Sequence, residues 1–149
     1  MANRLTLVLA TLLLATPAYA ETVDGSRVII IDGDTVNLPC PAATKGQRGC
    51  SERIRLINID TPEISSVQCE AAYQLGLAAK DVLAELIRGK PVTVRRDGRD
   101  RYGRTLAYLS VNGQDIGEAL ITAGVALRWR PGPKAKAARV REWCGGAGA

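Results

Sequence analysis

The sequence predicts an α+β protein that is mainly β, and two observations carry the prediction. Short β-branched or alternating runs recur between turn residues such as Asp-Gly and Asn-Gly. One long segment has apolar residues at helical spacing. The elements follow the order strand, strand, strand, helix, strand, strand, helix, helix. This order suits a five-stranded barrel of the oligonucleotide/oligosaccharide-binding (OB) type with about three helices.

Five segments have the composition of strands and are bounded by turn residues. They are residues 27–31, 35–38, 53–59, 91–95 and 105–111. The first two flank an Asp-Gly turn at 32–34, which is a strong hairpin signal. A loop at 39–52, with two prolines and two glycines, separates the second strand from the third. The last two strands lie on either side of an arginine-rich turn.

The longest predicted helix covers residues 71–87, which corresponds to about five turns. Ser65 followed by Gln68 suits a capping box at its start, and Gly89 suits its C-terminal end. Two shorter helices are expected, at 116–122 and 134–143.

The first 20 residues have the pattern of a secretory signal peptide. Arg4 precedes an apolar run at 5–15, and Ala18-Tyr19-Ala20 has the small-x-small pattern that a signal peptidase cuts. The apolar run is shorter than the roughly 20 residues of a membrane span. An uncleaved N-terminal anchor is the alternative. We therefore expect a domain at 21–149 that is secreted or periplasmic, with no membrane association after cleavage.

The charge and the missing histidine narrow the function classes. A formal net charge of +5 favours polyanionic partners. The chain has no histidine, which excludes Ser-His-Asp and Cys-His hydrolysis as well as histidine-ligated zinc. Acid–base chemistry at neutral pH must then use carboxylates, Lys, Tyr, Cys or metal-bound water.

Four cysteines in an exported chain predict two disulfides. Their spacing contains no Cys-x-x-Cys pair, which argues against a zinc site. Of the three possible pairings we expect Cys40–Cys50 and Cys69–Cys144. The first would close a local loop, and the second would tie the C-terminal tail to the start of the long helix.

Three short segments hold the residues suited to chemistry, at 32–35, 60–63 and 100–104. Each also has a purely structural reading. The first could be a hairpin turn, the second a strand end followed by a helix start, and the third a charged loop. Taken together, the three segments favour a reaction centre.

The chemistry that these segments favour is phosphoryl transfer. Asp34 and Asp60, with Glu63 close by in sequence, supply hard oxygen ligands of the sort that Ca²⁺ or Mg²⁺ takes. Arg55 and Arg104 offer planar, permanently charged forks that match phosphate oxygens. A metal, cations for the transition state and a carboxylate to take a proton from water are the parts that such a reaction needs.

Convergence of these groups requires an irregular strand end. Strict alternation places Arg55 and Asp60 on opposite faces of one strand, because they are an odd number of residues apart. The chain must therefore leave regular pleating near Asp60, and Thr61-Pro62 is the expected point of departure.

The same segments resemble a known family. Residues 32–35, 55–63 and 100–108 are similar, in order and spacing, to the three signature segments of the thermonuclease (staphylococcal nuclease-like) family. The resemblance covers about residues 27–130, and residues 117–124 resemble the family's second helix. It implies an OB barrel with three helices and Ca²⁺-dependent cleavage of DNA and RNA that leaves 3′-phosphate ends.

The resemblance also implies a metal site and a group that acts on water. By motif position, Asp34 and Asp60 would be carboxylate ligands of Ca²⁺, and Thr61 would offer its backbone carbonyl. Glu63 would orient or deprotonate the attacking water.

Further positions correspond to groups that contact the substrate. Arg55 and Arg104 would grip the phosphate and stabilise the charge that develops on it. Arg101 and Tyr102 match positions that contact a neighbouring phosphate. Trp129 stands where well-known members present tyrosines near the base, and its alternative role is packing under the C-terminal helix.

The chain departs from well-known members in two places. The loop at 39–52 carries two cysteines that they lack, and the segment between Glu63 and the long helix looks shorter. We expect a monomer that acts on DNA and RNA with little sequence specificity.

Two other classes of function are weighed against a nuclease. The first is a non-catalytic OB-fold nucleic-acid-binding module, but clustered acids repel phosphate and would not serve binding. The second is a secreted, disulfide-stapled structural or inhibitory protein, which leaves the paired arginines and acids unexplained.

Overall fold

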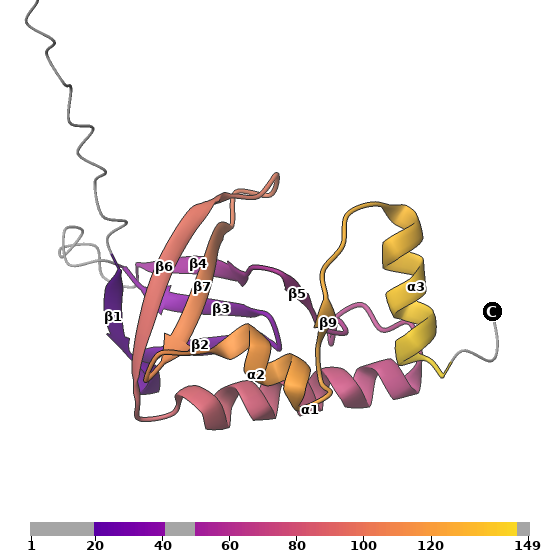
Figure 1. Cartoon of the computed structure of the whole chain (residues 1–149), viewed down its shortest axis with the longest axis horizontal. Helices are drawn as coiled ribbons and strands as arrows, with labels where there is room; N and C mark the ends of the chain where they lie inside the picture. Colours follow the sequence, from indigo (N-terminus) through magenta and orange to yellow (C-terminus); the bar gives the residue numbers. More distant parts are fainter. Residues whose placement is uncertain (1–19, 41–49, 146–149) are drawn as a thin grey trace, which may run out of the picture.

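The computed structural model describes residues 20–40 and 50–145 (Figure 1). Its elements in chain order are β1 (Glu21–Asp24), η1 (Gly25–Arg27), β2 (Ile29–Asp32), β3 (Thr35–Pro39), β4 (Ser51–Leu56), β5 (Ile59–Asp60), α1 (Glu70–Ile87), β6 (Pro91–Arg99), β7 (Thr105–Val111), β8 (Gln114–Asp115), α2 (Ile116–Thr122), β9 (Leu127–Arg128) and α3 (Pro133–Trp143). Except for Ala20, the predicted signal peptide lies outside the described residues. Among the residues described, no helix is both long and apolar enough to cross a membrane.

A seven-stranded sheet forms the body of the molecule, with strand order β1-β6-β7-β4-β3-β2 and β8 added to β7. Its neighbours are antiparallel except β4 and β7, which run parallel and pair Ile54 with Thr105 and Arg55 with Leu106. β5 leaves this sheet and pairs with β9 in a second, two-stranded sheet. The mainly β, α+β class with three α-helices is confirmed. The barrel is open, because β1 and β2 stand at opposite edges of the described sheet.

The core lies between the sheet and α1. Alternate residues of β7 are buried, as expected for a strand with one face on the core. From α1, Ala79, Leu83 and Ile87 are buried at helical spacing. α1 runs along the base of the sheet, and α3 stands over its N-terminal end beside β9 (Figure 1).

The start of α1 differs from the prediction. The helix begins at Glu70 with Cys69 as its N-cap, and the Cys69 sulfur accepts a hydrogen bond from the Ala72 N–H at 3.4 Å. Ser65 is therefore not the cap. Residues 61–69 form an irregular connection, so the alternative reading of 60–63 as a strand end followed by a helix start is wrong in its second part. Cys69 is also joined to Cys144 by a disulfide, which ties the end of the connection to α3.

Both predicted disulfides are present, Cys40–Cys50 and Cys69–Cys144. The second joins the N-cap of α1 to the C-cap of α3. Within α3 only Arg139 and Trp143 are buried. The attachment of α3 to the domain therefore depends on this disulfide and on two side chains.

The strands extend beyond the predicted segments. β6 continues to Arg99 because it forms a long hairpin with β7, with an irregularity between Arg96 and Arg99. The predicted strand at 53–59 is divided into β4 and β5, and three further strands, β1, β8 and β9, were not expected from the sequence. Each has two to four residues and is defined by its pairing partner, which leaves little periodic signal in the chain itself.

Candidate active site

The Asp-Gly turn between β2 and β3 places Asp34 inside the protein. The Asp34 N–H donates to the Asp32 carboxylate at 3.2 Å, which closes the turn. The Asp34 carboxylate accepts hydrogen bonds from the Thr35 hydroxyl at 3.1 Å and from the Thr61 N–H at 2.8 Å. These contacts hold Asp34 next to the segment that carries Asp60.

Gly33 lets this turn pack closely against α1. A Cβ atom at Gly33 would lie 2.5 Å from the Cβ of Ala79 and 2.9 Å from a side-chain carbon of Thr61. Both neighbours are buried, so neither can move aside easily. The hairpin turn is thus held by contacts with α1 as well as by its own hydrogen bonds. These contacts keep Asp34 buried.

Arg55 bridges the two aspartates. Its guanidinium nitrogens lie 2.6 Å from an Asp34 oxygen and 2.6 Å from an Asp60 oxygen. It also donates to the backbone carbonyls of Asp34 and Leu56, at 3.4 and 3.3 Å. Only 12% of the Arg55 side chain is exposed, and both of its terminal nitrogens already contact the protein.

The chain leaves the pleated strand earlier than predicted. β4 ends at Leu56, and Asn58 adopts a positive φ of 66°. The two-residue interruption at 57–58 changes the alternation, so that Asp60 returns to the side of Arg55. Asp60 then lies in β5, opposite Leu127 of β9. The break therefore falls before Asp60, and not at Thr61-Pro62.

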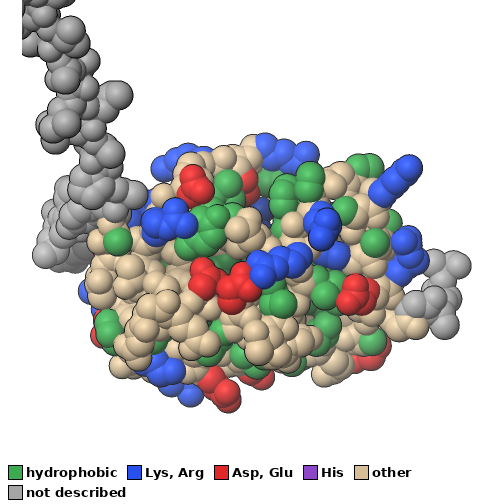
Figure 2. All heavy atoms as spheres, in the orientation of Figure 1, with side chains coloured by type: hydrophobic (Ala, Val, Ile, Leu, Met, Phe, Trp, Pro, Cys, Tyr) green, Lys and Arg blue, Asp and Glu red, His purple; other side chains and the backbone are tan. Residues whose placement is uncertain are grey.

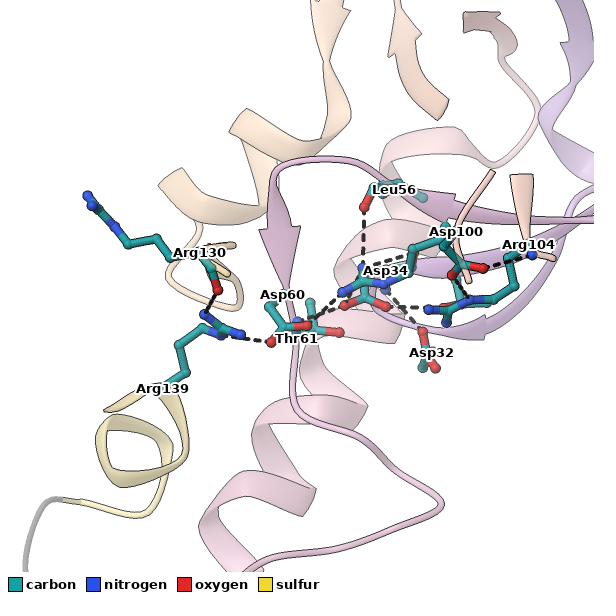
Figure 3. Close-up of polar contacts among 11 residues, drawn as sticks. Asp32, Asp34, Leu56, Asp60, Thr61, Asp100, Arg104, Arg130 and Arg139 are labelled. Atoms are coloured by element: carbon teal, nitrogen blue, oxygen red, sulfur yellow. Dashed lines mark hydrogen bonds and ion pairs between the residues drawn. The ribbon is translucent and has the colours of Figure 1, made fainter. Parts of the chain in front are cut away.

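Arg139 of α3 is a site residue that sequence reasoning missed. Its Nε donates to Asp60 at 2.8 Å, and its Nη1 donates to the backbone carbonyl of Arg130 at 3.1 Å. Figure 3 shows Arg139 and Arg104 on opposite sides of Asp60 and Asp34. Arg139 and Asp60 are 79 residues apart in the chain, so no local pattern announces their contact.

The Asp34 carboxyl is shielded from solvent, and burial and neighbouring charges together set its pKa. Burial raises its pKa to about 7, Arg55 opposes this shift, and the nearby charge of Asp32 adds to it. Additional positive charge would stabilise the ionised form of such a group. Within residues 20–40 and 50–145, no group of three or more His, Cys, Asp or Glu side chains is arranged to hold a metal ion.

Glu63 lies just beyond this cluster. The residue as a whole is exposed, although part of its carboxyl is shielded from solvent. Loss of solvent around the carboxyl raises the pKa of Glu63, the charge of Asp32 raises it further, and Arg55 lowers it. Among the described residues, the Glu63 side chain has no hydrogen bond or ion-pair partner. Its carboxyl is therefore available to a water molecule.

The turn between β6 and β7 holds Arg104 in a different way. Asp100 accepts hydrogen bonds from the N–H groups of Tyr102 and Arg104, at 2.9 and 3.0 Å. Its second oxygen accepts from Nε of Arg104 at 2.7 Å. Gly103, with φ of 80°, completes the turn. The terminal nitrogens of Arg104 make no hydrogen bond or ion pair with the described residues and remain available to an anion.

A cavity of about 730 Å³ lies between two walls. We call them the hairpin wall and the α3 wall. The hairpin wall is made of Asp100, Arg101, Tyr102 and Arg104, and the α3 wall of Trp129, Arg130, Lys136 and Arg139. The cavity is therefore bounded on both sides by cations and an aromatic ring.

The floor of the cavity comes from the paired strands β4 and β7 and from the segment that follows β4. Arg55 lies at one end, followed by Leu56, Ile57, Asn58 and Leu106. Figure 2 shows basic side chains along the upper part of this face, from the β6–β7 hairpin to α3.

The structure brings most of the predicted site together. Arg55, Arg101, Tyr102, Arg104 and Trp129 line the cavity. Thr61 and the predicted acidic residues of the site are not among its lining residues; these acidic residues are Asp34, Asp60 and Glu63. Contacts through Arg55 and the Thr61 N–H nevertheless join Asp34, Asp60 and Thr61 to its edge, whereas these contacts do not include Glu63.

Trp129 does not pack under α3. It is 49% exposed, and its backbone N–H donates to the Asn58 carbonyl at 2.9 Å. This bond continues the β5–β9 pairing and places the ring at the cavity. The packing residue of α3 is Trp143.

Comparison with known proteins gives a consistent result. A family model described as "Staphylococcal nuclease homologue" matches residues 53–143. The chain is 33% identical over 100 residues to a protein named "Thermonuclease" from Staphylococcus intermedius, covering 65% of this chain and 54% of that protein. It is 35% identical over 133 residues to an "Uncharacterized endonuclease" of Haemophilus influenzae, covering 87% and 67%.

A further relative is an "Uncharacterized endonuclease" of Escherichia coli O157:H7. It is 32% identical over 111 residues, covering 74% of this chain and 63% of that protein. The chain spans about half to two thirds of the length of these curated relatives.

Proposed function

This chain belongs to the staphylococcal nuclease homologue family, and we propose that it is a nuclease that hydrolyses phosphodiester bonds in DNA and RNA. One observation carries the proposal. Arg55 and Arg104 stand at one cavity, with the carboxylates of Asp34 and Asp60 at its edge. A protein that only binds nucleic acid gains nothing from two acids, one of them buried, beside its phosphate site.

In the proposed reaction the oxygen of a water molecule attacks phosphorus and the bond from phosphorus to the 5′ oxygen breaks. The phosphate stays on the 3′ oxygen of one product, and the 5′ oxygen of the other takes a proton. Glu63 orients the water or accepts its proton, and the raised pKa of Glu63 makes it a better base than an ordinary carboxylate.

The two arginines stabilise the charge that grows on the phosphate oxygens. Arg104 presents its terminal nitrogens while Asp100 holds its Nε, which limits the number of orientations that it can take. Arg55 has less freedom, because its nitrogens already contact Asp34 and Asp60. Arg101 and Tyr102 of the hairpin wall bind a neighbouring phosphate, and Trp129 of the α3 wall contacts a base.

We propose Ca²⁺ as the cofactor, since the donor set fits a hard cation. Asp34 and Asp60 each contact the guanidinium of Arg55 at 2.6 Å, so the two carboxylates that would hold the ion face the same cationic group. These carboxylates would hold the ion together with the carbonyl of Thr61. Because only two acidic side chains contribute, water or phosphate oxygens must complete the coordination. The ion supplies positive charge that stabilises a phosphate under attack.

Export is part of the same proposal. The signal-like pattern at residues 1–20 and the two disulfides favour a secreted or periplasmic enzyme. We expect the domain at 21–149 to act as a monomer with little sequence specificity.

The test uses purified oxidised protein with single-stranded DNA and with RNA, in the presence of Ca²⁺ or of a chelator. We expect cleavage only with Ca²⁺, products with 3′-phosphate ends, and a circular dichroism spectrum that chelation leaves unchanged. The double variant Arg55→Ala, Arg104→Ala should be folded and inactive. The matched control is Arg88→Gln, which removes an exposed arginine at the end of α1.

Two outcomes would overturn the assignment. A folded double variant that still digests DNA at the parent rate would remove the two arginines from catalysis. A parent protein that binds DNA but cuts neither substrate would favour the non-catalytic OB-fold module.

A further inference from the structure

We propose that Arg95, whose guanidinium lies over the ring of Tyr108, forms a stacking subsite for one base of a longer single-stranded substrate. This subsite lies beyond the cavity and is separate from the nucleotide that the cavity holds. The inference rests on the proposed function, because it assumes a polynucleotide substrate. It identifies that substrate as a single strand long enough to leave the cavity along β7.

The first observation is the geometry of the pair. The guanidinium carbon of Arg95 lies 4.0 Å from the centre of the Tyr108 ring. Arg95 on β6 is the register partner of Tyr108 on β7, so the sheet itself sets this stack. Arg95 is exposed. Its guanidinium therefore has one face on tyrosine and another available to a planar ligand.

The second observation is the continuity of this pair with the cavity. Arg104, Leu106 and Tyr108 alternate with buried residues of β7, so they lie on one outer face of the strand. Arg104 and Leu106 line the cavity. Tyr108 is the next position outward, about 7 Å beyond Leu106 at the usual rise of a strand.

The third observation is a direct bond between the two places. Asn58, on the cavity floor, donates its side-chain N–H to the Tyr108 hydroxyl at 3.1 Å. The backbone carbonyl of Asn58 accepts from the Trp129 N–H on the opposite side. Asn58 thus fixes the Tyr108 ring relative to the cavity, which orders the platform before any substrate binds.

The chemistry of the pair favours a base over a phosphate alone. An exposed arginine that only bound phosphate would work without a ring beneath it. The guanidinium is itself planar, and bases of single strands stack on such planes and on aromatic rings. The positive charge of the pair also suits the adjacent backbone.

The experiment measures the binding and cleavage of two substrates. One is a dinucleotide, which cannot extend past the cavity. The other is a single-stranded oligonucleotide of about ten nucleotides, within the range that one OB fold covers. The variants are Arg95→Gln, which removes charge and plane, and Arg95→Lys, which keeps the charge and removes the plane. Arg88→Gln is the control.

We expect both Arg95 variants to weaken binding of the long substrate about fivefold or more, with kcat unchanged. This loss is at the low end of the effect of removing one stacked base. Binding of the dinucleotide should stay within twofold of the parent. In the parent, an abasic nucleotide at one position outside the dinucleotide should weaken binding similarly. In Arg95→Gln that abasic penalty should disappear.

The remaining outcomes overturn the inference. Equal losses on both substrates would show that the pair serves only the structure. A normal Arg95→Lys protein would show that charge alone matters. Binding is measured by fluorescence anisotropy with Ca²⁺ omitted, so a parent that binds but does not cut tests the subsite independently of the nuclease proposal.

Discussion

The two walls of the cavity hold their arginines in opposite ways. On the hairpin wall, Arg104 is fixed by Asp100, four residues away, inside one turn. On the α3 wall, Arg139 is fixed by Asp60, 79 residues away. The first contact forms wherever the turn forms. The second exists only when α3 is docked on the rest of the domain.

The Arg104–Asp100 contact is therefore local, whereas the Arg139–Asp60 contact depends on tertiary structure. The hairpin wall should keep its shape in variants that loosen the domain. The α3 wall should be lost early, because only Arg139, Trp143 and one disulfide anchor its helix. The following predictions test the two walls against each other.

The largest expected effect is on the α3 wall. Replacing Cys69 and Cys144 by serine opens a crosslink that spans 75 residues. The free energy of unfolding should fall by about 4 kcal/mol by the chain-entropy argument. Urea unfolding measures the change, and KM for a long substrate should rise at the same time because α3 is released.

The control for this prediction is the other disulfide. Cys40→Ser with Cys50→Ser opens a loop of only 10 residues, with an expected loss of about 3 kcal/mol. Neither cysteine lines the cavity, so KM should stay at the parent value. A KM that rises equally in both double variants would show that general loosening, and not the α3 wall, is responsible.

The second effect is on the hairpin wall. Arg104→Lys and Arg104→Ala should each lower kcat at least about a hundredfold, since a point charge cannot reproduce the planar fork. Stability should change little, because the side chain is partly exposed and held within one turn. Steady-state kinetics and urea unfolding test both statements. A lysine variant with parent kcat would contradict the role of the fork.

The third effect links the α3 wall to the acidic cluster. Arg139→Gln removes one of the two cationic partners of Asp60 and should cost about 2 kcal/mol of stability. With Asp60 less constrained, kcat should fall about tenfold. Lys136→Gln, on the same wall but exposed, is the matched control and should alter KM more than kcat. Unchanged kinetics in Arg139→Gln would restrict Arg139 to a structural role.

The smallest effect concerns the base of the hairpin wall. Glu52 of β4 accepts hydrogen bonds from Arg96 at 2.6 to 3.1 Å and from the Thr105 hydroxyl at 2.7 Å. Burial alone would raise the pKa of Glu52, but these bonds outweigh burial and lower it. The resulting stability is present above the pKa of the unfolded chain, about 4.3, and is lost as pH falls through the lower folded value.

Glu52→Gln should therefore reduce stability by about 1 kcal/mol at pH 7. The gap between variant and parent should shrink as pH falls below about 4, because only the parent titrates there. Urea unfolding at a series of pH values gives the comparison. Glu85→Gln, exposed on α1, should show no gap at any pH.

The same contrast explains what the sequence could predict. The hairpin wall, both disulfides and the placement of Arg55, Arg101, Tyr102, Arg104 and Trp129 at one cavity followed from turn residues, cysteine spacing and the resemblance to a family. Local patterns are enough where the structure is local.

Other features depend on contacts that no short window contains. Arg139 is one basic residue among several in a polar helix, and only docking singles it out. The stack of Arg95 on Tyr108 needs the β6–β7 register, which the bulge between Arg96 and Arg99 shifts. The departure of the chain at Asn58 required a positive φ that the sequence alone did not announce.

The parallel pairing of β4 with β7 has a consequence for how the protein folds. A parallel pair cannot form as a hairpin. Here the segment of chain that connects β4 to β7 includes α1 and β6. The chain must therefore close a long loop before Ile54 meets Thr105, which is slow compared with local contacts. Arg55 and Arg104 lie at this junction. Folding intermediates with only hairpins and helices would lack the site, so activity would appear with the last long-range contacts to form.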